Sequence, residues 1–176
     1  MVGCSRDSRR FTGVTQLKFR LLHAGSAARG ALGEAADDYR SRLNRHPKAT
    51  AEEHFVKPVK LRREMAADIQ KALATEGERI AKKLDSNSFV IALDRCGKQL
   101  SSPQVAAALE RAEEMGRRSV TLLLGSSHGL DHSLVAQADL RWSFGPLTLP
   151  HDLARVVLWE QLFRARAIRD GNPYHK

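Results

Sequence analysis

Two short apolar runs constrain the fold of this chain more than any other feature. Residues 89–93 read Phe-Val-Ile-Ala-Leu, and residues 120–124 read Val-Thr-Leu-Leu-Leu. Strands of a parallel sheet are covered by helices on both faces and therefore read as apolar runs of this kind, whereas strands with one wet face alternate. The two runs predict strands inside a sheet that is covered on both sides.

The segments around these runs complete an alternating pattern of strands and helices. The order predicted is β-α-β-α-β-α-β-β-α, which is typical of an α/β domain with a largely parallel sheet flanked by helices. The predicted strands cover residues 17–24, 51–59, 89–94, 120–124 and 139–144, and the predicted helices cover residues 32–46, 66–84, 102–115 and 151–169.

Local signals refine three of these elements. Leu17, Phe19 and Leu21 alternate with basic residues, which predicts a half-buried first strand. Pro58 interrupts the second strand and favours an edge position for it. Ser102 followed by Pro103 predicts a helix that is capped at residue 102 and opens at residue 103.

Length and charge limit the classes of function. The chain has 176 residues with a formal net charge of +9, a size expected of one domain. An excess of positive charge favours a polyanionic partner such as RNA, and residues 40–63 concentrate it with eight basic side chains against Glu52 and Glu53. A solvated basic face is the alternative interpretation. No apolar run approaches the ~20 residues that span a bilayer, so we expect no membrane role.

The first residues differ in character from the remainder. Residues 1–16 are rich in Arg and Ser and contain one acidic residue, which is typical of a disordered basic arm or of the start of a transit peptide. The single folded domain is therefore expected to cover residues 17–176. Cys4 and Cys96 are far apart and fit neither a disulfide framework nor a metal site, which is typical of a reducing compartment.

Three loops are expected to meet at one edge of the sheet. Leu93 and Asp94 end one predicted strand, Gly125 follows the next, and residues 144–149 (Phe-Gly-Pro-Leu-Thr-Leu) follow the last. Ligands of parallel sheets bind beyond the carboxyl ends of the strands. We expect these loops to share a crevice, in which Gly125 and Gly129 allow close backbone approach or serve as ordinary turn residues.

Other motifs suggest other chemistries. Neither a dinucleotide fingerprint nor a P-loop is present. His128 and His132 have metal-ligand spacing but lack a clear third ligand, so we expect no metal. Residues 125–129 contain the literal pattern G-x-S-x-G, so a serine hydrolase with Ser127 as nucleophile, Asp131 or Asp139 as acid and His151 as base stays an alternative.

Several further strings carry a family resemblance. They are Leu-Leu-Gly at 123–125, Trp-Ser-Phe at 142–144, Leu-Thr-Leu-Pro-His at 147–151, Arg155, and Asn-Pro-Tyr-His at 172–175. With residues 43–47 and 75–78, these strings resemble the RlmH family from about Leu17 to the C-terminus. Members of this family are SPOUT-superfamily methyltransferases that methylate N3 of a pseudouridine in 23S large-subunit ribosomal RNA. A noncatalytic RNA-binding module remains the alternative for a basic chain of this kind.

The resemblance implies a fold, a cofactor and partners. It implies a SPOUT-type domain whose C-terminal part forms a deep trefoil knot, a cytoplasmic homodimer, and ribosomal RNA in the ribosome as substrate. It also implies S-adenosylmethionine as cofactor. The residues carried over as its binding site are Leu93, Gly125, Phe144, Gly145, Pro146, Leu147, Thr148 and Leu149.

The resemblance and the chemistry of the residues also nominate catalytic groups. His151 is a candidate proton acceptor for the imide, and Arg155 a candidate to stabilise the imide anion or bind a phosphate. Tyr174 and His175 are expected to reach the substrate base. Arg155, Arg166 and Arg169 share one helical face, which predicts a phosphate-facing stripe or a solvated face. Val156, Trp159 and Phe163 form a predicted core or dimer face.

Two positions depart from the family pattern. Ser126 stands where a second glycine is expected, which puts close cofactor approach there in doubt. Lys176 stands where the family usually has Arg, and a lysine replaces a planar two-pronged donor with a point charge.

Overall fold

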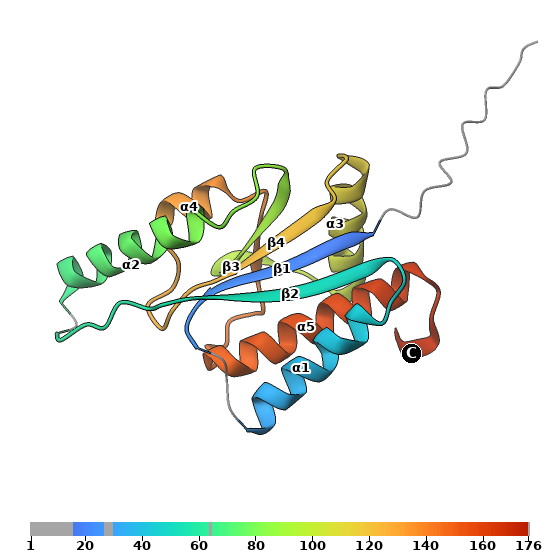
Figure 1. The fold of residues 1–176 in the computed structure, drawn as a ribbon, viewed down its shortest axis with the longest axis horizontal. Coiled ribbons are helices and arrows are strands. Elements are labelled where there is room, and N and C mark those ends of the chain that lie inside the picture. The colour runs from blue at the N-terminus through green and yellow to red at the C-terminus, as the bar shows by residue number, and fades with distance from the viewer. Residues whose placement is uncertain (1–15, 27–29, 64, 176) are drawn as a thin grey trace, which may run out of the picture.

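The computed structural model describes residues 16–26, 30–63 and 65–175. Within them, five strands form one sheet in the order β2-β1-β4-β3-β5, with every neighbouring pair parallel. This confirms the predicted α/β class (Figure 1). The strands are β1 (Leu17–Ala24), β2 (Ala49–Val56), β3 (Ser88–Gln99), β4 (Ser119–Leu124) and β5 (Leu140–Ser143). The helices are α1 (Ala31–Asn44), α2 (Ala66–Ala81), α3 (Ser102–Glu114), α4 (His132–Gln137), α5 (His151–Arg169) and the 3-10 turn η1 (Pro173–His175).

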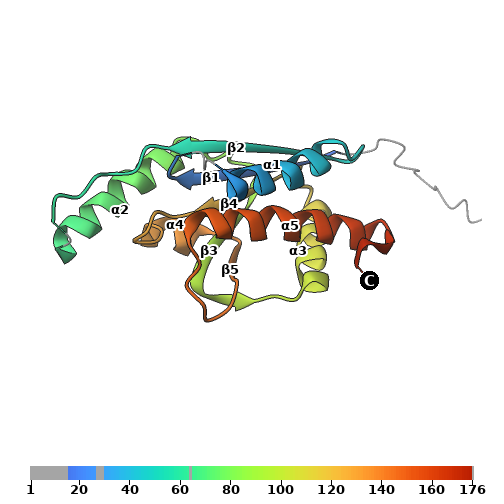
Figure 2. The ribbon, with the colours of Figure 1, turned by 90° about the horizontal axis from the view of Figure 1, so that it is seen from below.

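Each face of the sheet has its own core. Helices α1, α3 and α5 cover one face with a large cluster that includes Phe19, Leu122 and Leu158. Helices α2 and α4 cover the other face with a smaller cluster, which contains Leu22, Val56, Ile80, Leu123 and Leu134. Figure 1 shows this division, with α2 and α4 on the opposite side of the sheet from α1 and α5, and Figure 2 shows α1 and α5 side by side.

The first strand is more deeply buried than predicted. Leu21, Leu22, His23 and Ala24 are consecutive and all buried, so the carboxyl half of β1 is covered on both faces. The half-buried pattern holds only over its first residues. The reason is topological, because β1 lies between β2 and β4 and not at an edge. His23 therefore occupies a fully buried position in an otherwise apolar stretch.

The second strand lies at the edge of the sheet, as predicted from Pro58. The segment after it is tied to α2, because Glu76 accepts a hydrogen bond from the backbone N–H of Val59 at 2.8 Å. Arg79 donates to the carbonyl of Lys57 at 2.6 Å. The basic segment 57–63 is therefore held to α2 at its first residues.

Strand β3 continues farther than its apolar run predicted. Its pairing with β4 ends at Ala92, and its pairing with β5 shifts register between Leu93 and Lys98. A Cβ on Gly97 would lie 2.7 Å from backbone atoms of Arg141, so only glycine allows the two segments to pass this closely. The trefoil knot that the resemblance implies stays a prediction.

Two helix starts differ from the sequence prediction. Ser101, and not Ser102, caps α3, and it forms a capping box with Gln104. The prediction was one residue late because two serines precede Pro103 and both satisfy the same rule. Helix α4 was not predicted, since its six residues are too few for a helical period to be detected.

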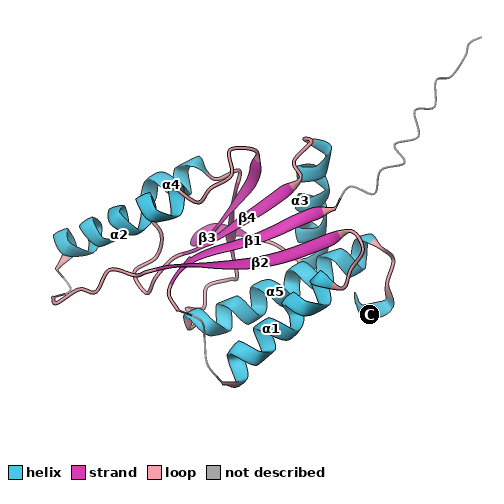
Figure 3. Ribbon diagram, in the orientation of Figure 1, coloured by secondary structure: helices cyan, strands magenta, loops and turns pink. Residues whose placement is uncertain are grey.

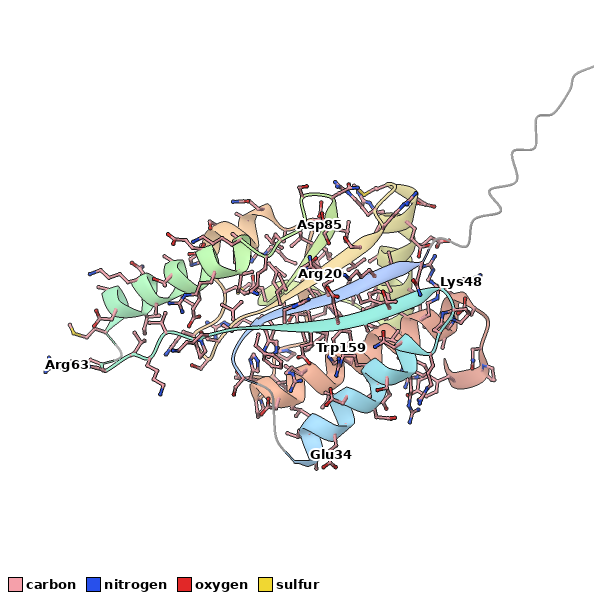
Figure 4. All side chains as sticks on the ribbon, viewed as in Figure 1. Arg20, Glu34, Lys48, Arg63, Asp85 and Trp159 are labelled. Carbon is pink, nitrogen blue, oxygen red and sulfur yellow. The ribbon has the colours of Figure 1, made fainter. Side chains whose placement is uncertain are left out.

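The buried face of α5 belongs to the core. Trp159 is fully buried among residues of the larger cluster, and Val156 and Phe163 pack against that cluster with partial exposure. Figure 4 shows Trp159 between α5 and the sheet. Among the described residues, no helix is long and apolar enough to cross a membrane.

Candidate active site

Loops from three strands meet at the carboxyl edge of the sheet, as predicted. Leu93 of β3 pairs with Trp142 of β5, and the loop after β5 runs from Phe144 to Pro150 and enters α5. Figure 3 shows the loops that follow β1 and β4 near the start of α5. The residues expected to contact a cofactor therefore lie on adjacent segments.

The loop after β5 is fastened to the end of β3. Ser143 Oγ lies 3.2 Å from the carbonyl oxygens of both Arg95 and Gly145. The ring of Phe144 packs edge-on against that of Trp142, with 4.9 Å between ring centroids. Gly145 has a φ of 113°, a conformation that favours glycine. The loop is thus anchored where it leaves the sheet.

Farther along the same loop, side chains face solvent. Pro146, Leu147 and Thr148 are exposed, and Leu147 is 75% exposed. Ligand sites commonly present apolar side chains beside a few polar groups. The loop therefore offers an exposed apolar surface on the segment that leads into α5.

Gly125 is required by the geometry of its own loop. Residues 126–129 form a tight turn in which Gly129 N donates to the Ser126 carbonyl at 2.9 Å. A Cβ on Gly125 would lie 2.1 Å from the Gly129 carbonyl oxygen, a distance that no side chain can adopt. Ser126 causes no such conflict at the next position. The glycine at 125 thus lets the loop close on itself.

His151 joins two of the loops. It is the first residue of α5, directly after the loop from β5, and its ring lies beside the backbone of Gly125. Its Nε2 lies 2.7 Å from Nδ1 of His23. Gly25 leaves room for this contact, because a Cβ there would lie 3.2 Å from His151 Nε2.

A chain of buried polar groups continues inward from His151. His23 Nε2 lies 2.9 Å from Glu53 Oε1, and His23 is completely buried. Arg155 donates from Nε and Nη2 to the two oxygens of Glu53, each at 2.7 Å. The four groups come from β1, β2 and α5, so packing of the helix on the sheet assembles the network.

The surroundings of these groups shift their protonation. Burial lowers the pKa of His151 below its ordinary value of 6.5, and the neighbouring His23 and Arg155 lower it further. Burial alone would raise the pKa of Glu53, but hydrogen bonds from His23 and Arg155 lower it to about 2. At neutral pH the network therefore presents an uncharged imidazole at the site and a carboxylate behind it.

The structure revises the expected role of Arg155. Its side chain is only 2% exposed, and its two-pronged contact is with Glu53. Direct contact of this guanidinium with a phosphate or an imide anion is not compatible with that arrangement. A helical wheel gives the direction of a side chain but not its burial.

Arg166 and Arg169 are also engaged within the protein. Arg166 is buried and contacts Asp170, while Arg169 forms an ion pair with Glu113. They are neither a solvated face nor free to bind phosphate. Both line a cavity of about 560 Å³ near the far end of α5, which is distant from His151 along the helix.

The C-terminal tail lies away from the loops within one chain. The ring of Tyr174 packs against that of Phe163, with 4.8 Å between ring centroids. Its hydroxyl oxygen lies 3.4 Å from the Tyr39 hydroxyl oxygen and 3.4 Å from Glu160 Oε1. Burial and the hydrogen bond with Tyr39 raise the pKa of Tyr174 to about 12. Phe163 is twelve positions after His151 in α5, about 18 Å along the helix. Tyr174 therefore does not join His151 in a single chain.

The hydrolase and metal alternatives gain no geometric support. Asp131 caps α4 by accepting from Ser133 N, and Asp139 accepts from Val90 N. The described contacts of the His151 ring are with His23 and Gly125, so neither acid orients it as a triad requires. Within the described ranges, no group of three His, Cys, Asp or Glu side chains is placed to hold a metal ion.

Sequence analysis missed two residues of the network, His23 and Glu53. A signal for His23 existed, because a histidine inside an apolar strand must find a polar partner when it is buried. Its partner could not be identified, since His23 and His151 are 128 positions apart. Residues 1–15 and Lys176, on which two further expectations rest, lie outside the described residues.

Comparison with known proteins agrees with this architecture. A probable methylase family protein from Haemophilus influenzae Rd KW20 has a similar fold, with a TM-score of 0.53 at 12% identity over 90% of this chain and 67% of that one. A probable methyltransferase from Bordetella pertussis Tohama I gives a TM-score of 0.51 at 14% identity over 86% of this chain and 97% of that one. At such identities the likeness concerns the fold alone.

Sequence relatives are closer. The chain is 36% identical to the protein named ribosomal RNA large subunit methyltransferase H from Desulfitobacterium hafniense, over 91% of this chain and 99% of that protein. It is 38% identical to the protein of the same name from Bifidobacterium adolescentis, over 91% and 100% of the two chains. The family model described as "Predicted SPOUT methyltransferase" matches residues 17–175. The chain therefore belongs to the SPOUT methyltransferase family.

Proposed function

We propose that this protein transfers the methyl group of S-adenosylmethionine to N3 of a pseudouridine in 23S large-subunit ribosomal RNA. The observation that carries the proposal is the placement of an uncharged His151 where the Gly125 loop meets the loop from β5. The relatives named as ribosomal RNA large subunit methyltransferase H support the class of substrate. A ribosomal substrate also favours a cytoplasmic location.

The cofactor site proposed here consists of Leu93, Gly125 and the loop of residues 144–149. Gly125 lies beside His151 at the end of β4, and the exposed Leu147 offers an apolar surface on the loop that leads into His151. When bound, S-adenosylmethionine supplies a methyl group on a positively charged sulfur. No metal ligand set is required for this transfer.

The role proposed for His151 is to accept the proton of the imide. Loss of the N3–H proton leaves an electron pair on N3, which forms the new N–CH₃ bond while the C–S bond breaks. A base must be uncharged to accept a proton, and the lowered pKa of His151 keeps it so at neutral pH. Arg155 acts through Glu53 and His23 as a positioning residue and does not contact the substrate.

In a homodimer, the C-terminal tail of one copy would reach the His151 site of the other copy. Tyr174 lies far from His151 of its own chain, as described above. We propose that Tyr174 and His175 approach the substrate base bound at the site of a second copy. The RNA site would then draw on both subunits, as the family resemblance implies.

The basic residues 57–63 are the proposed contact for the RNA backbone. Lys60, Arg62 and Arg63 are exposed and form no ion pair with another described residue. Figure 4 shows Arg63 at the outer tip of the segment before α2. Arg40 and Arg42, by contrast, are paired with Asp37 and Asp38.

We expect replacement of Lys60, Arg62 and Arg63 by Ser to weaken binding of ribosomal RNA and to flatten its salt dependence. Each lost phosphate contact should reduce the slope of log K against log salt by about 0.7–0.9. Filter binding across a range of salt concentrations measures the slope. Replacement of Arg40 and Arg42 by Ser is the matched control, because their charges are already paired. An equal change in both variants would assign the effect to net charge alone.

The direct test of the proposed function is methyl transfer. Purified protein is incubated with methyl-labelled S-adenosylmethionine and ribosomes that carry the pseudouridine but lack its methyl group. Ribosomes without the pseudouridine serve as the control. We expect label in large-subunit RNA of the first sample only. Salt-sensitive RNA binding without label in either sample would support a noncatalytic RNA-binding module instead.

A further inference from the structure

His23 is a buried titratable group that the proposed mechanism uses only as a link between Glu53 and His151. It lies on β1 with no exposed surface, and its ring packs edge-on against Phe55 at 4.4 Å between centroids. Burial of a polar ring is costly unless both nitrogens find partners. A leucine would fill such a position at lower cost, so the contacts of the two nitrogens are the point of interest.

Each nitrogen of His23 faces one member of the network. Nδ1 lies 2.7 Å from His151 Nε2, and Nε2 lies 2.9 Å from Glu53 Oε1. Two ring nitrogens at this separation share a single proton, because two N–H groups or two lone pairs would repel each other. The tautomer of His151 is therefore tied to that of His23.

The two rings have different charged neighbours. An imidazolium at His151 would be partly desolvated beside Arg155, with Asp152 as the nearby acid. An imidazolium at His23 would lie against the Glu53 carboxylate. Glu53 also binds Arg155, which faces Asp152 on α5 and Asp37 on α1. The pKa of Glu53, about 2, means that a proton does not come to rest on that carboxylate.

We propose that His23 is a proton relay that receives, through His151, the proton removed from the substrate. In the resting state His151 carries its proton on Nε2, directed at His23 Nδ1, and His23 carries its proton on Nε2, which lies 2.9 Å from Glu53 Oε1 as an ion-pair contact. The N3–H bond of the substrate breaks as a proton binds His151 Nδ1. The proton on His151 Nε2 then moves to His23 Nδ1, which leaves His151 neutral and His23 as an imidazolium paired with Glu53.

Of the two ring nitrogens of His151, Nε2 faces His23, which leaves Nδ1 for the substrate. Only protons move in these steps, and no oxidant or further reactant is needed. The inference rests on the proposed function, since it assumes that His151 accepts a proton from the substrate.

The test compares two substitutions of His23 by single-turnover methyl transfer across pH. His23→Gln keeps hydrogen-bonding capacity but cannot take up a proton, and His23→Phe keeps the ring shape but neither nitrogen. We expect both to lower the rate about 10- to 100-fold, while the KM for S-adenosylmethionine changes little. The acid limb of the pH–rate profile should move to higher pH, because His23 lowers the pKa of His151.

The matched control is His54→Gln. His54 lies on β2 beside Glu53 in sequence, but it pairs with Glu52 and is 36% exposed. We expect its rate and pH profile to equal those of the parent protein. Full activity of His23→Gln together with loss in His23→Phe would overturn the relay, because a positioning contact would then suffice. Unchanged activity in both variants would overturn it as well.

A spectroscopic measurement separates this inference from the proposed function and does not depend on the variants folding. In ¹⁵N-histidine-labelled parent protein, NMR should find His151 protonated at Nε2 and the two rings titrating as a coupled pair. Independent titration of the rings would overturn the relay. Coupled rings in a protein that fails to methylate pseudouridylated ribosomes would instead remove the proposed function, and with it the substrate as the source of the proton, while the shared proton between His23 and His151 would stand.

Discussion

Replacement of His151 by Gln is expected to lower the methyl-transfer rate by about 10²- to 10⁴-fold, the usual contribution of a general base. Glutamine retains a polar side chain at the first position of α5 but cannot accept the proton. Binding of S-adenosylmethionine should change little, because Gly125 and residues 144–149 remain in place. Single-turnover transfer to pseudouridylated ribosomes and calorimetric cofactor titration measure the two quantities.

His132→Ala is the matched control for that experiment. His132 begins α4 and is exposed, so its removal should leave the transfer rate within about two-fold, as expected of surface changes away from the site. The methyl-transfer rate of the parent protein should remain high below pH 6.5, since burial and the neighbouring His23 and Arg155 lower the pKa of His151 from that value. A His151→Gln protein with normal activity would show that the loops alone position and deprotonate the substrate.

Local chemistry explains which parts of the fold could be predicted. Apolar runs identified β3 and β4 because both faces of a parallel strand are covered, and Pro58 indicated the edge position of β2. The strand order depends on how helices cross the sheet, and no local pattern encodes it. Helix α4 escaped detection because its six residues depend on packing of Leu134 against the smaller core.

The candidate site was predictable to a similar extent. The loops after parallel strands lie at the same edge of the sheet, so Gly125 and the loop at 144–149 could be placed at one edge from the sequence. The partners of those residues could not, because Glu53 and Arg155 are 102 positions apart. Arg155 therefore looked like a phosphate ligand in the sequence, although its guanidinium is buried against Glu53. A buried ion pair gives no periodic signal.

The buried ion pair leads to the second large effect, which concerns stability. We expect Arg155→Met to lower the free energy of unfolding by about 3–5 kcal/mol, because it leaves the Glu53 carboxylate buried without its main partner. The side chains of Glu53 and Arg155 are 4% and 2% exposed, so little water can replace the lost contact. Urea denaturation followed by circular dichroism measures the change.

Two comparisons identify the source of that loss. Arg40→Met breaks a solvent-exposed pair with Asp37 and should cost at most about 1 kcal/mol. The double variant Glu53→Gln with Arg155→Met removes the buried charge and should recover part of the loss. If the double variant is as unstable as the sum of the single variants, lost packing and not the unpaired carboxylate is responsible.

Acid titration tests the same pair independently. The pKa of Glu53 is lowered from 4.5 to about 2 in the folded protein, so its contribution is fully present above pH 4.5 and declines as pH falls toward 2. A shift of this size corresponds to a contribution on the order of 3 kcal/mol. Arg155→Met removes one cause of the lowered pKa, so its unfolding free energy should fall less steeply across that window. Glu52, whose pKa is also lowered to about 2, titrates there in both proteins, so the difference between them isolates the buried pair. Parallel curves would mean that His23 alone holds the Glu53 carboxylate in its charged form.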